Sequence, residues 1–137
     1  MGVVYDEGIF NSGYNLTITN STLSGNSAGT YGGGINNIRT LTLTNSTLSG
    51  NSANSGGGIS NLSDSTLNIA NTIIANSTSG GDYAGNGTVT LIPSGNSNNP
   101  TISANNIVTQ ASSSATSAWA QSVTSAQLNL GPLQNNG

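Results

Sequence analysis

Apolar and polar residues alternate in two nearly identical stretches of this chain, residues 16–28 and 41–53. The stretches match at twelve of thirteen positions, and Ile18 in the first corresponds to Leu43 in the second. In the segment "LTLTN" every second residue is apolar, so Leu41 and Leu43 share one face of an extended strand. This spacing of two excludes an amphipathic helix, whose period is about 3.6 residues, and predicts a β-strand with one buried face.

The same segments recur at a nearly constant spacing along the chain. "GIFN", "GINN" and "GISN" begin at Gly8, Gly34 and Gly58. Residues 65–77 form a third, diverged copy of the opening stretch, and residues 87–96 resemble a fourth and looser one. The period of roughly 25 residues falls within the range of about 20 to 50 that is typical of solenoids and other repeat architectures.

Each repeat divides into three short strands, "LTLTN", "STLSGN" and "GGGISN", with turns between them. One such coil cannot bury its apolar face alone, whereas stacked coils enclose a narrow core. We therefore predict an all-β fold, a right-handed parallel β-helix (β-solenoid) of about five coils of roughly 25 residues. In this fold Leu16, Leu41 and Leu67 form one column. A low-complexity linker would not keep apolar residues in register over three copies.

Asparagine recurs at the ends of the predicted strands. Asn20, Asn45 and Asn71 are expected to form a side-chain amide ladder along the axis, as stacked asparagines do in cross-β structures. Asn26 and Asn51 fit a second ladder, from which the third copy is out of phase by about one residue. The glycine-rich segments 32–34 and 56–58 are expected to supply the positive φ angles or close backbone contacts of sharp corners.

We expect one domain, with β-solenoid coils over residues 1–110 and a divergent C-terminal coil or cap over 111–137. The segment 111–127 does not follow the repeat, and the sequence leaves open whether it forms an alanine-rich helix or irregular strands. The single tryptophan, Trp119, lies in this segment and is expected to pack at one end of the coil.

Charge is nearly absent from the chain. Its 137 residues include 22 Asn, 22 Ser, 19 Gly and 17 Thr, and the net charge is −3. The charged residues are Asp6, Glu7, Arg39, Asp64 and Asp82, and there is no Lys, His or Cys. One arginine cannot neutralise a row of phosphates, so nucleic acid is excluded as a partner. The sequence also contains no disulfide framework and no apolar run long enough for a membrane span.

The repeats resemble those of a known group of proteins. The segments "LTLTNSTLSGNSA", "GGGISN" and "NTIIANSTSGGDYAGNGTVT", and the final "LGPLQNNG", resemble the right-handed parallel β-helix repeats of large bacterial surface and secreted proteins, of the polymorphic outer-membrane-protein-like and choice-of-anchor types. The resemblance covers residues 8 to 92 and 130–137. It implies an extracellular or cell-surface location. Gly81, Asp82 and Tyr83 stand where the relatives often have Gly-Asp-Cys, which excludes a thiol-based role.

No secretory signal is recognisable at the start of the chain. The opening "MGVVYDEGIF" has neither a basic segment nor a long apolar segment. We expect either that a signal peptide has been removed or that the protein is not exported by that route.

The sequence predicts no catalytic residue, no cofactor and no metal site. A glycosidase needs two carboxyl groups about 5 to 9.5 Å apart, but Asp64 and Asp82 are out of phase with the repeat. Asp6 and Glu7 are adjacent, so on an extended strand they point to opposite faces. Without histidine there is no triad. We therefore expect a protein that is not an enzyme.

Three smaller features bear on surface roles. Arg39 lies about one period from both Tyr14 and Asp64, which favours an ion pair or a cation–π contact between coils. Six N-x-S/T triplets begin at Asn15, Asn20, Asn45, Asn61, Asn76 and Asn86, and several are expected by chance in this composition. An outward T-x-T array, of the kind found on ice-binding β-solenoids, is formed by Thr17, Thr19, Thr42 and Thr44. It is expected to stop where Asn68 and Ala70 follow.

The expected function is structural. A β-solenoid has two open ends with unpaired backbone groups, and contacts between unlike ends that do not close produce filaments. We expect an extracellular or cell-surface rod, whose partner is a second copy of itself in a head-to-tail filament, or which forms an adhesin stalk. A binding module for glycans or ice is the alternative, and a polysaccharide-active enzyme comes third.

Overall fold

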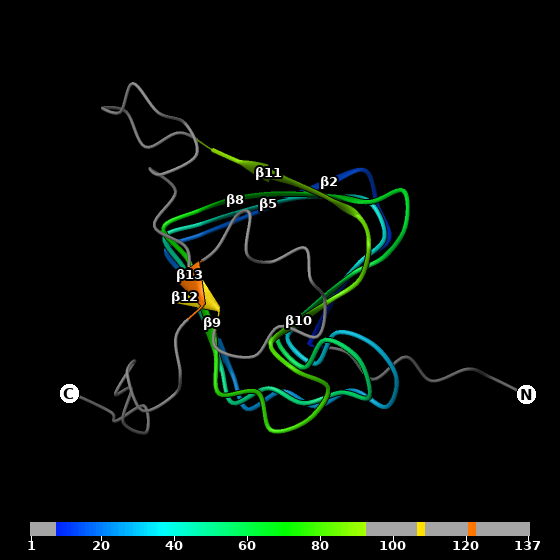
Figure 1. Cartoon of the computed structure of the whole chain (residues 1–137). Coiled ribbons are helices and arrows are strands. Elements are labelled where there is room, and N and C mark those ends of the chain that lie inside the picture. The colour runs from blue at the N-terminus through cyan, green and yellow to red at the C-terminus, as the bar shows by residue number, and fades with distance from the viewer. Residues whose placement is uncertain (1–7, 93–106, 109–120, 123–137) are drawn as a thin grey trace, which may run out of the picture.

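The chain winds into a coil with three parallel β-sheets along its sides (Figure 1). The computed structural model describes residues 8–92, 107–108 and 121–122. Sheet A contains β1 (Ile9–Asn11), β4 (Ile35–Asn37), β7 (Ile59–Asn61) and β10 (Tyr83–Ala84). Sheet B contains β2 (Asn15–Thr19), β5 (Thr40–Thr44), β8 (Thr66–Ala70) and β11 (Thr88–Leu91). Sheet C contains β3 (Thr22–Ser24), β6 (Thr47–Ser49), β9 (Ile73–Ala75), β12 (Ile107–Val108) and β13 (Gln121–Ser122).

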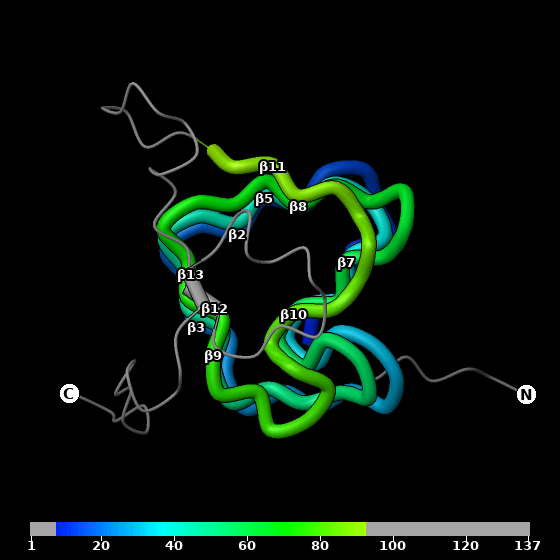
Figure 2. The backbone as a smooth tube through the Cα atoms, viewed as in Figure 1, coloured from blue at the N-terminus to red at the C-terminus, as the bar shows by residue number. Residues whose placement is uncertain are grey.

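The predicted parallel β-solenoid is confirmed. Each turn of the coil adds one strand to each sheet, and every strand pairs in parallel with its counterpart in the next turn. Leu16 pairs with Leu41, Leu41 with Leu67, and Leu67 with Val89, so the predicted column is continuous. The chain winds anticlockwise as it approaches the viewer in Figure 2, which makes the coil right-handed.

The expected number of coils is too high for the part of the chain that is described. Residues 8–92 form about three turns, and β12 and β13 continue sheet C alone. Ile73 pairs with Ile107, a much longer step along the chain than in the earlier turns, and Ile107 pairs with Gln121, a much shorter one. The regular period is therefore lost there. β13 falls in the predicted C-terminal coil or cap, residues 111–137, most of which lies outside the described residues.

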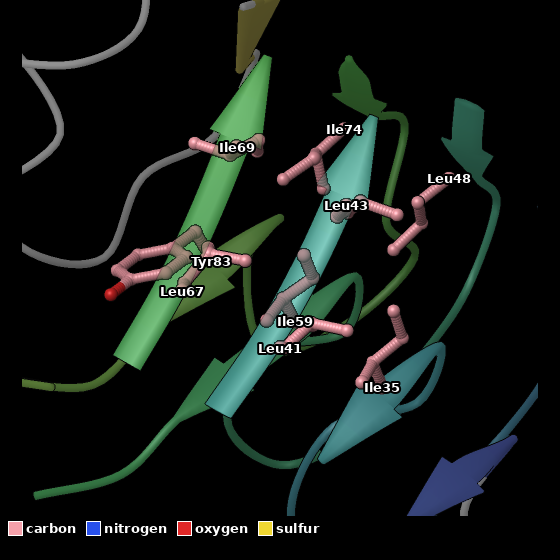
Figure 3. Packing of buried hydrophobic residues seen from close by; sticks show 9 residues of the cluster. All are labelled: Ile35, Leu41, Leu43, Leu48, Ile59, Leu67, Ile69, Ile74 and Tyr83. Atoms are coloured by element: carbon pink, nitrogen blue, oxygen red, sulfur yellow. The ribbon is translucent and has the colours of Figure 1, made fainter. Parts of the chain in front are cut away.

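The core is a narrow stack of mainly aliphatic side chains between the three sheets (Figure 3). Its members come from all three sheets and are fully or almost fully buried: Ile35, Leu41, Leu43, Leu48, Ile59, Leu67, Ile69, Ile74 and Tyr83. Alternation explains this, because successive side chains of a strand point to opposite faces. The inward positions of β5 are buried leucines and its outward positions are threonines.

Asparagine and glycine form the corners, as the sequence predicts. Asn20, Asn45 and Asn71 have φ angles of 50, 51 and 50°, in the left-handed region that asparagine tolerates better than most residues. The Asn71 amide donates to Asn45 Oδ1 at 3.1 Å, which confirms the first ladder for this pair. Gly32 and Gly56 also have positive φ angles, of 59 and 64°.

Candidate functional site

A buried asparagine ladder runs along the inside of sheet A. Asn11 Nδ2 donates to Asn37 Oδ1, and Asn37 Nδ2 donates to Asn61 Oδ1, each at a distance of 2.7 Å. The same amide groups also donate to backbone carbonyls, Asn11 to Thr40 and Asn37 to Thr66. The ladder therefore fastens each turn to the next by side chains as well as by the sheet. Asn37 Nδ2 also donates to the Arg39 carbonyl in its own turn, and the other bonds of the ladder's amide donors run to later turns of the coil.

Tyr83 lies at the last described step of this ladder. Asn61 Nδ2 donates to the Tyr83 hydroxyl at 3.4 Å, and Tyr83 pairs in register with Ile59. Only 1% of Tyr83 is exposed. Burial raises the pKa of the Tyr83 hydroxyl above its ordinary value of 10.0, and the hydrogen bond from Asn61 offsets part of this rise.

The second predicted ladder is confirmed between the first two turns. Asn51 Oδ1 accepts hydrogen bonds from both the backbone and the side chain of Asn26, at 2.9 and 3.1 Å. Asn51 itself donates to the Leu23 carbonyl. Further along, the buried carboxyl group of Asp82 accepts a hydrogen bond from the backbone N–H of Ser77, a local contact between residues five positions apart rather than a bond between stacked positions.

The expected phase shift near Asn76 is also present. Ser49 pairs with Ala75, but Ser52, three positions further on, pairs with Ser79, four positions beyond Ala75. One extra residue is therefore inserted in the third turn. Asn76 lies at this point and has a φ angle of 56°.

The first turn leaves its apolar side chains partly uncovered. Ile9, Leu16, Ile18 and Leu23 are only half-buried, whereas their counterparts in the second turn, Ile35, Leu41, Leu43 and Leu48, have no exposed area. The difference arises because the second turn is covered on both sides and the first is covered by described residues on one side only. Val89 and Leu91 are likewise half-buried in the last described turn.

The outward face of sheet B includes more threonines than the four of the predicted T-x-T array. Of eleven outward positions in its four strands, eight are threonine: Thr17, Thr19, Thr40, Thr42, Thr44, Thr66, Thr88 and Thr90. The other three are Asn15, Asn68 and Ala70. As expected, the array of Thr17, Thr19, Thr42 and Thr44 is interrupted in the third turn, because Asn68 pairs with Thr42 and Ala70 with Thr44. Threonine nevertheless continues in the neighbouring column through Thr66 and Thr88, and Thr90 follows Asn68.

Arg39 makes neither of the contacts that its spacing favours. Its Nη1 donates to the carbonyl of the preceding Ile38 at 3.2 Å, and within residues 8–92 it forms no ion pair with Asp64. Tyr14 is 94% exposed, so its ring stacks on nothing. Asp64 stands in an exposed corner with a φ angle of 64°. The one-period spacing places these residues in neighbouring turns, but in corners whose side chains point into solvent.

The described carboxyl groups lie in unlike surroundings. Asp82 is fully buried and Asp64 is exposed. Across the described residues, no group of three or more His, Cys, Asp or Glu side chains could hold a metal ion. Asp6, Glu7 and Trp119 lie outside the described residues.

The structure separates the six N-x-S/T triplets by accessibility. The Asn61 side chain is buried in the ladder, whereas Asn15, Asn20, Asn45 and Asn86 are exposed. Asn76 is half-buried.

Compared with protein-family models, with curated proteins and with solved structures, the chain matches none of them. Its structure shows a β-helix repeat without assigning it to a family. In the part of the chain that the structure describes, no helix has the length and apolar character needed to cross a bilayer.

Two features, the buried asparagine ladder and the threonines of the third and fourth strands of sheet B, were not predicted from the sequence. The buried ladder could have been found from the last letters of "GIFN", "GINN" and "GISN", which place asparagine at one position of three successive repeats. The continued threonine array could have been found by extending the repeat to Thr66 and Thr88, which precede the strictly alternating segments.

Proposed function

We propose that this chain is a non-catalytic structural segment that stacks end to end on copies of itself. The observation that carries the proposal is the difference in burial between the first two turns. Leu16 and Ile18 are half-buried at the end of the described coil, while Leu41 and Leu43 are completely buried by like residues one turn away. A further turn of the same cross-section would cover the first turn in the same way.

The sequence itself supplies a suitable partner surface. Residues 16–28 and 41–53 are almost identical, so the first turn offers a second copy nearly the same surface that the second turn offers to the third. At the other end of sheet B, β11 pairs with β8 alone among the described strands and presents half-buried Val89 and Leu91. Contact between unlike ends does not close and yields a filament.

The backbone at the first edge is oriented for such stacking. Asn20 donates its N–H to Thr44 and Tyr14 accepts from Thr40, so the even-numbered residues of β2 bond to β5. In a parallel ladder, successive residues of a strand direct their backbone N–H and C=O groups to opposite sides. The N–H groups of Asn15, Thr17 and Thr19 therefore point away from β5, toward the open edge, where a strand of a second copy would accept them.

Replacement of one edge residue tests the proposal. Thr17→Pro removes an N–H that points away from β5, so no hydrogen bond to β5 is lost. Proline is tolerated at such positions of edge strands. We expect wild-type protein at neutral pH to form fibres whose length increases with concentration, and Thr17→Pro to remain monomeric. Electron microscopy and sedimentation velocity measure both. Thr17→Val keeps the N–H and should form fibres as the wild type does.

The outcome depends on intact folding of the variants. Circular dichroism of dilute samples should give similar melting curves for Thr17→Pro and Thr17→Val. Compact monomers of the wild type across a wide concentration range would refute the stacking proposal. Fibres that form equally well from Thr17→Pro would show that assembly uses a different surface.

The proposal includes an extracellular or cell-surface location, as a filament subunit or as the stalk of an adhesin. It is supported by the resemblance of residues 8 to 92 to the repeats of bacterial surface proteins and by the scarcity of charge. Fractionation of a native host, with antibody detection at the surface and in the medium, tests the location separately from assembly.

A further inference from the structure

The outward face of sheet B is a two-dimensional array composed largely of threonine, which occupies eight of its eleven outward positions. Its columns run along the coil axis, because Thr17 pairs with Thr42, and Thr40 pairs with Thr66, which pairs with Thr88. Neighbours within a column are separated by the strand spacing of about 4.8 Å, and neighbours along a strand by two residues, or roughly 6.6 Å. Viewed along the axis, β2, β5 and β8 lie almost over one another, so this part of the face has little twist, whereas β11 runs at an angle to them (Figure 1).

The threonine side chains in this array are restrained. β-Branched side chains have few χ1 rotamers, and the Thr44 hydroxyl donates to Thr19 Oγ1 at 3.1 Å across neighbouring turns. Asn68 Nδ2 donates to Thr42 Oγ1 at 3.4 Å in the next column. Each threonine thus presents a methyl and a hydroxyl group at a repeating position, with little side-chain freedom left to lose on contact.

The composition of the face decides which partner it fits. The eleven outward positions of sheet B include no charged and no aromatic residue. Protein interfaces are enriched at their centres in aromatic residues, Met and Arg, and small-molecule sites are concave with a few placed polar groups. A flat, uncharged lattice is complementary only to an uncharged partner that is itself periodic. Polysaccharide crystals are bound largely through aromatic rings, which this face lacks.

We infer that the outward face of sheet B binds the surface of ice. The two repeat distances of the array are close to those of water molecules on the prism faces of ordinary ice, and the methyl groups favour ordered water between the hydroxyl groups. This inference does not depend on end-to-end stacking, since the face runs parallel to the axis. Stacking would lengthen the array without covering it.

Two lysine substitutions in the same turn test the inference. Thr42 lies at the centre of the sheet B array, and Thr47 is an outward, similarly half-buried threonine on sheet C. In an assay of ice recrystallisation with purified full-length protein, the wild type should retard crystal growth. Thr42→Lys should lose most of this effect, and Thr47→Lys should retain it.

A gain of function supplies a second test. Asn68→Thr replaces the one interruption in the column Thr17, Thr42, Asn68 and Thr90. It should increase the retardation of crystal growth and the thermal hysteresis relative to the wild type. Circular dichroism confirms that each variant is folded before the assay.

Several results would overturn the inference. One is wild-type protein that affects ice no more than an equal mass of an inert protein. Equal losses in Thr42→Lys and Thr47→Lys, or no gain in folded Asn68→Thr, would place any activity on another surface. Binding to microcrystalline cellulose or chitin, with no effect on ice, would identify a polysaccharide lattice as the partner instead.

Discussion

At the scale of single residues, asparagine has two distinct roles in this coil. At the corners it adopts positive φ angles, as the exposed Asn45 does, and this role does not require a buried side chain. Inside sheet A its amide group both donates and accepts, so that Asn37 joins Asn11 to Asn61 without leaving a polar atom unsatisfied. A buried amide is stabilising only when such partners are present. At the end of the ladder, the Tyr83 hydroxyl accepts a hydrogen bond from Asn61 Nδ2.

The raised pKa of Tyr83 gives this chain a dependence on alkaline pH. The folded-state pKa lies above the unfolded value, so the contribution of the neutral phenol to stability is complete below about pH 10. It is lost as the pH rises through the folded-state pKa. Tyr83→Phe should abolish this loss, because no hydroxyl remains to ionise. At neutral pH it should cost about 1 kcal/mol or less, since the bond from Asn61 is long.

Urea titrations of Tyr83→Phe between pH 7 and 11 measure both effects. Tyr14→Phe serves as the control, because Tyr14 is 94% exposed and its ring contacts little. If Tyr83→Phe and the wild type lost the same stability between pH 9 and 11, ionisation of Tyr83 would not be the cause.

At the scale of the elements, strands with strict alternation were predictable and the segments between them were less so. "LTLTN" predicted β5, because a period of two with buried leucine permits only one register. The Asn11–Asn37–Asn61 ladder was not predicted, since polarity alone suggests exposure, although these residues stand two positions after the apolar Ile9, Ile35 and Ile59 and so share their inward face. The predicted coils over residues 1–110 include β12, and the predicted divergent coil or cap includes β13, but the positions of both strands were not predicted because their spacing departs from the repeat.

At the glycine corners, the sensitivity to substitution depends on how closely the backbone of the neighbouring turn approaches. A Cβ atom on Gly34 would lie 2.6 Å from the Gly58 carbonyl oxygen and 3.2 Å from Asn51 Nδ2. Because the first neighbour is backbone, the sheet itself must shift, and Gly34→Ala should destabilise the fold by more than about 2 kcal/mol. A Cβ atom on Gly29 would meet nothing within 4 Å. Gly29→Ala should change the stability by less than about 1 kcal/mol.

Chemical denaturation of the two alanine variants gives the comparison directly. Equal stability of Gly34→Ala and Gly29→Ala would mean that the coils are spaced more widely at this corner than the structure shows.

At the scale of the whole molecule, the coil is a one-dimensional array in which each turn contacts only its neighbours. Stability in such an array is greatest where both neighbours are present. The second turn meets this condition and includes Ile35, Leu41, Leu43 and Leu48, all without exposed area. The first turn does not, and its apolar residues are half-buried. With one Arg and four acidic residues in the chain, charge contributes little to this gradient.

Hydrogen exchange should reveal the gradient and its removal by assembly. In dilute monomer, backbone amides of β5 should exchange more slowly than those of β2, because end turns open at lower free energy. Within β2, Thr17 and Thr19 should exchange fastest, since their N–H groups point to the open edge, whereas Leu16 and Ile18 bond to β5. In fibres the amides of Thr17 and Thr19 should become as slow as those of β5, as a second copy would then accept them. Amides on the exposed corner at Ser63 and Asp64 should be unchanged, which controls for slower exchange in any large particle. Exchange at Thr17 that stays fast in fibres would show that copies join through another surface, and that the half-buried leucines of the first turn are not what holds them together.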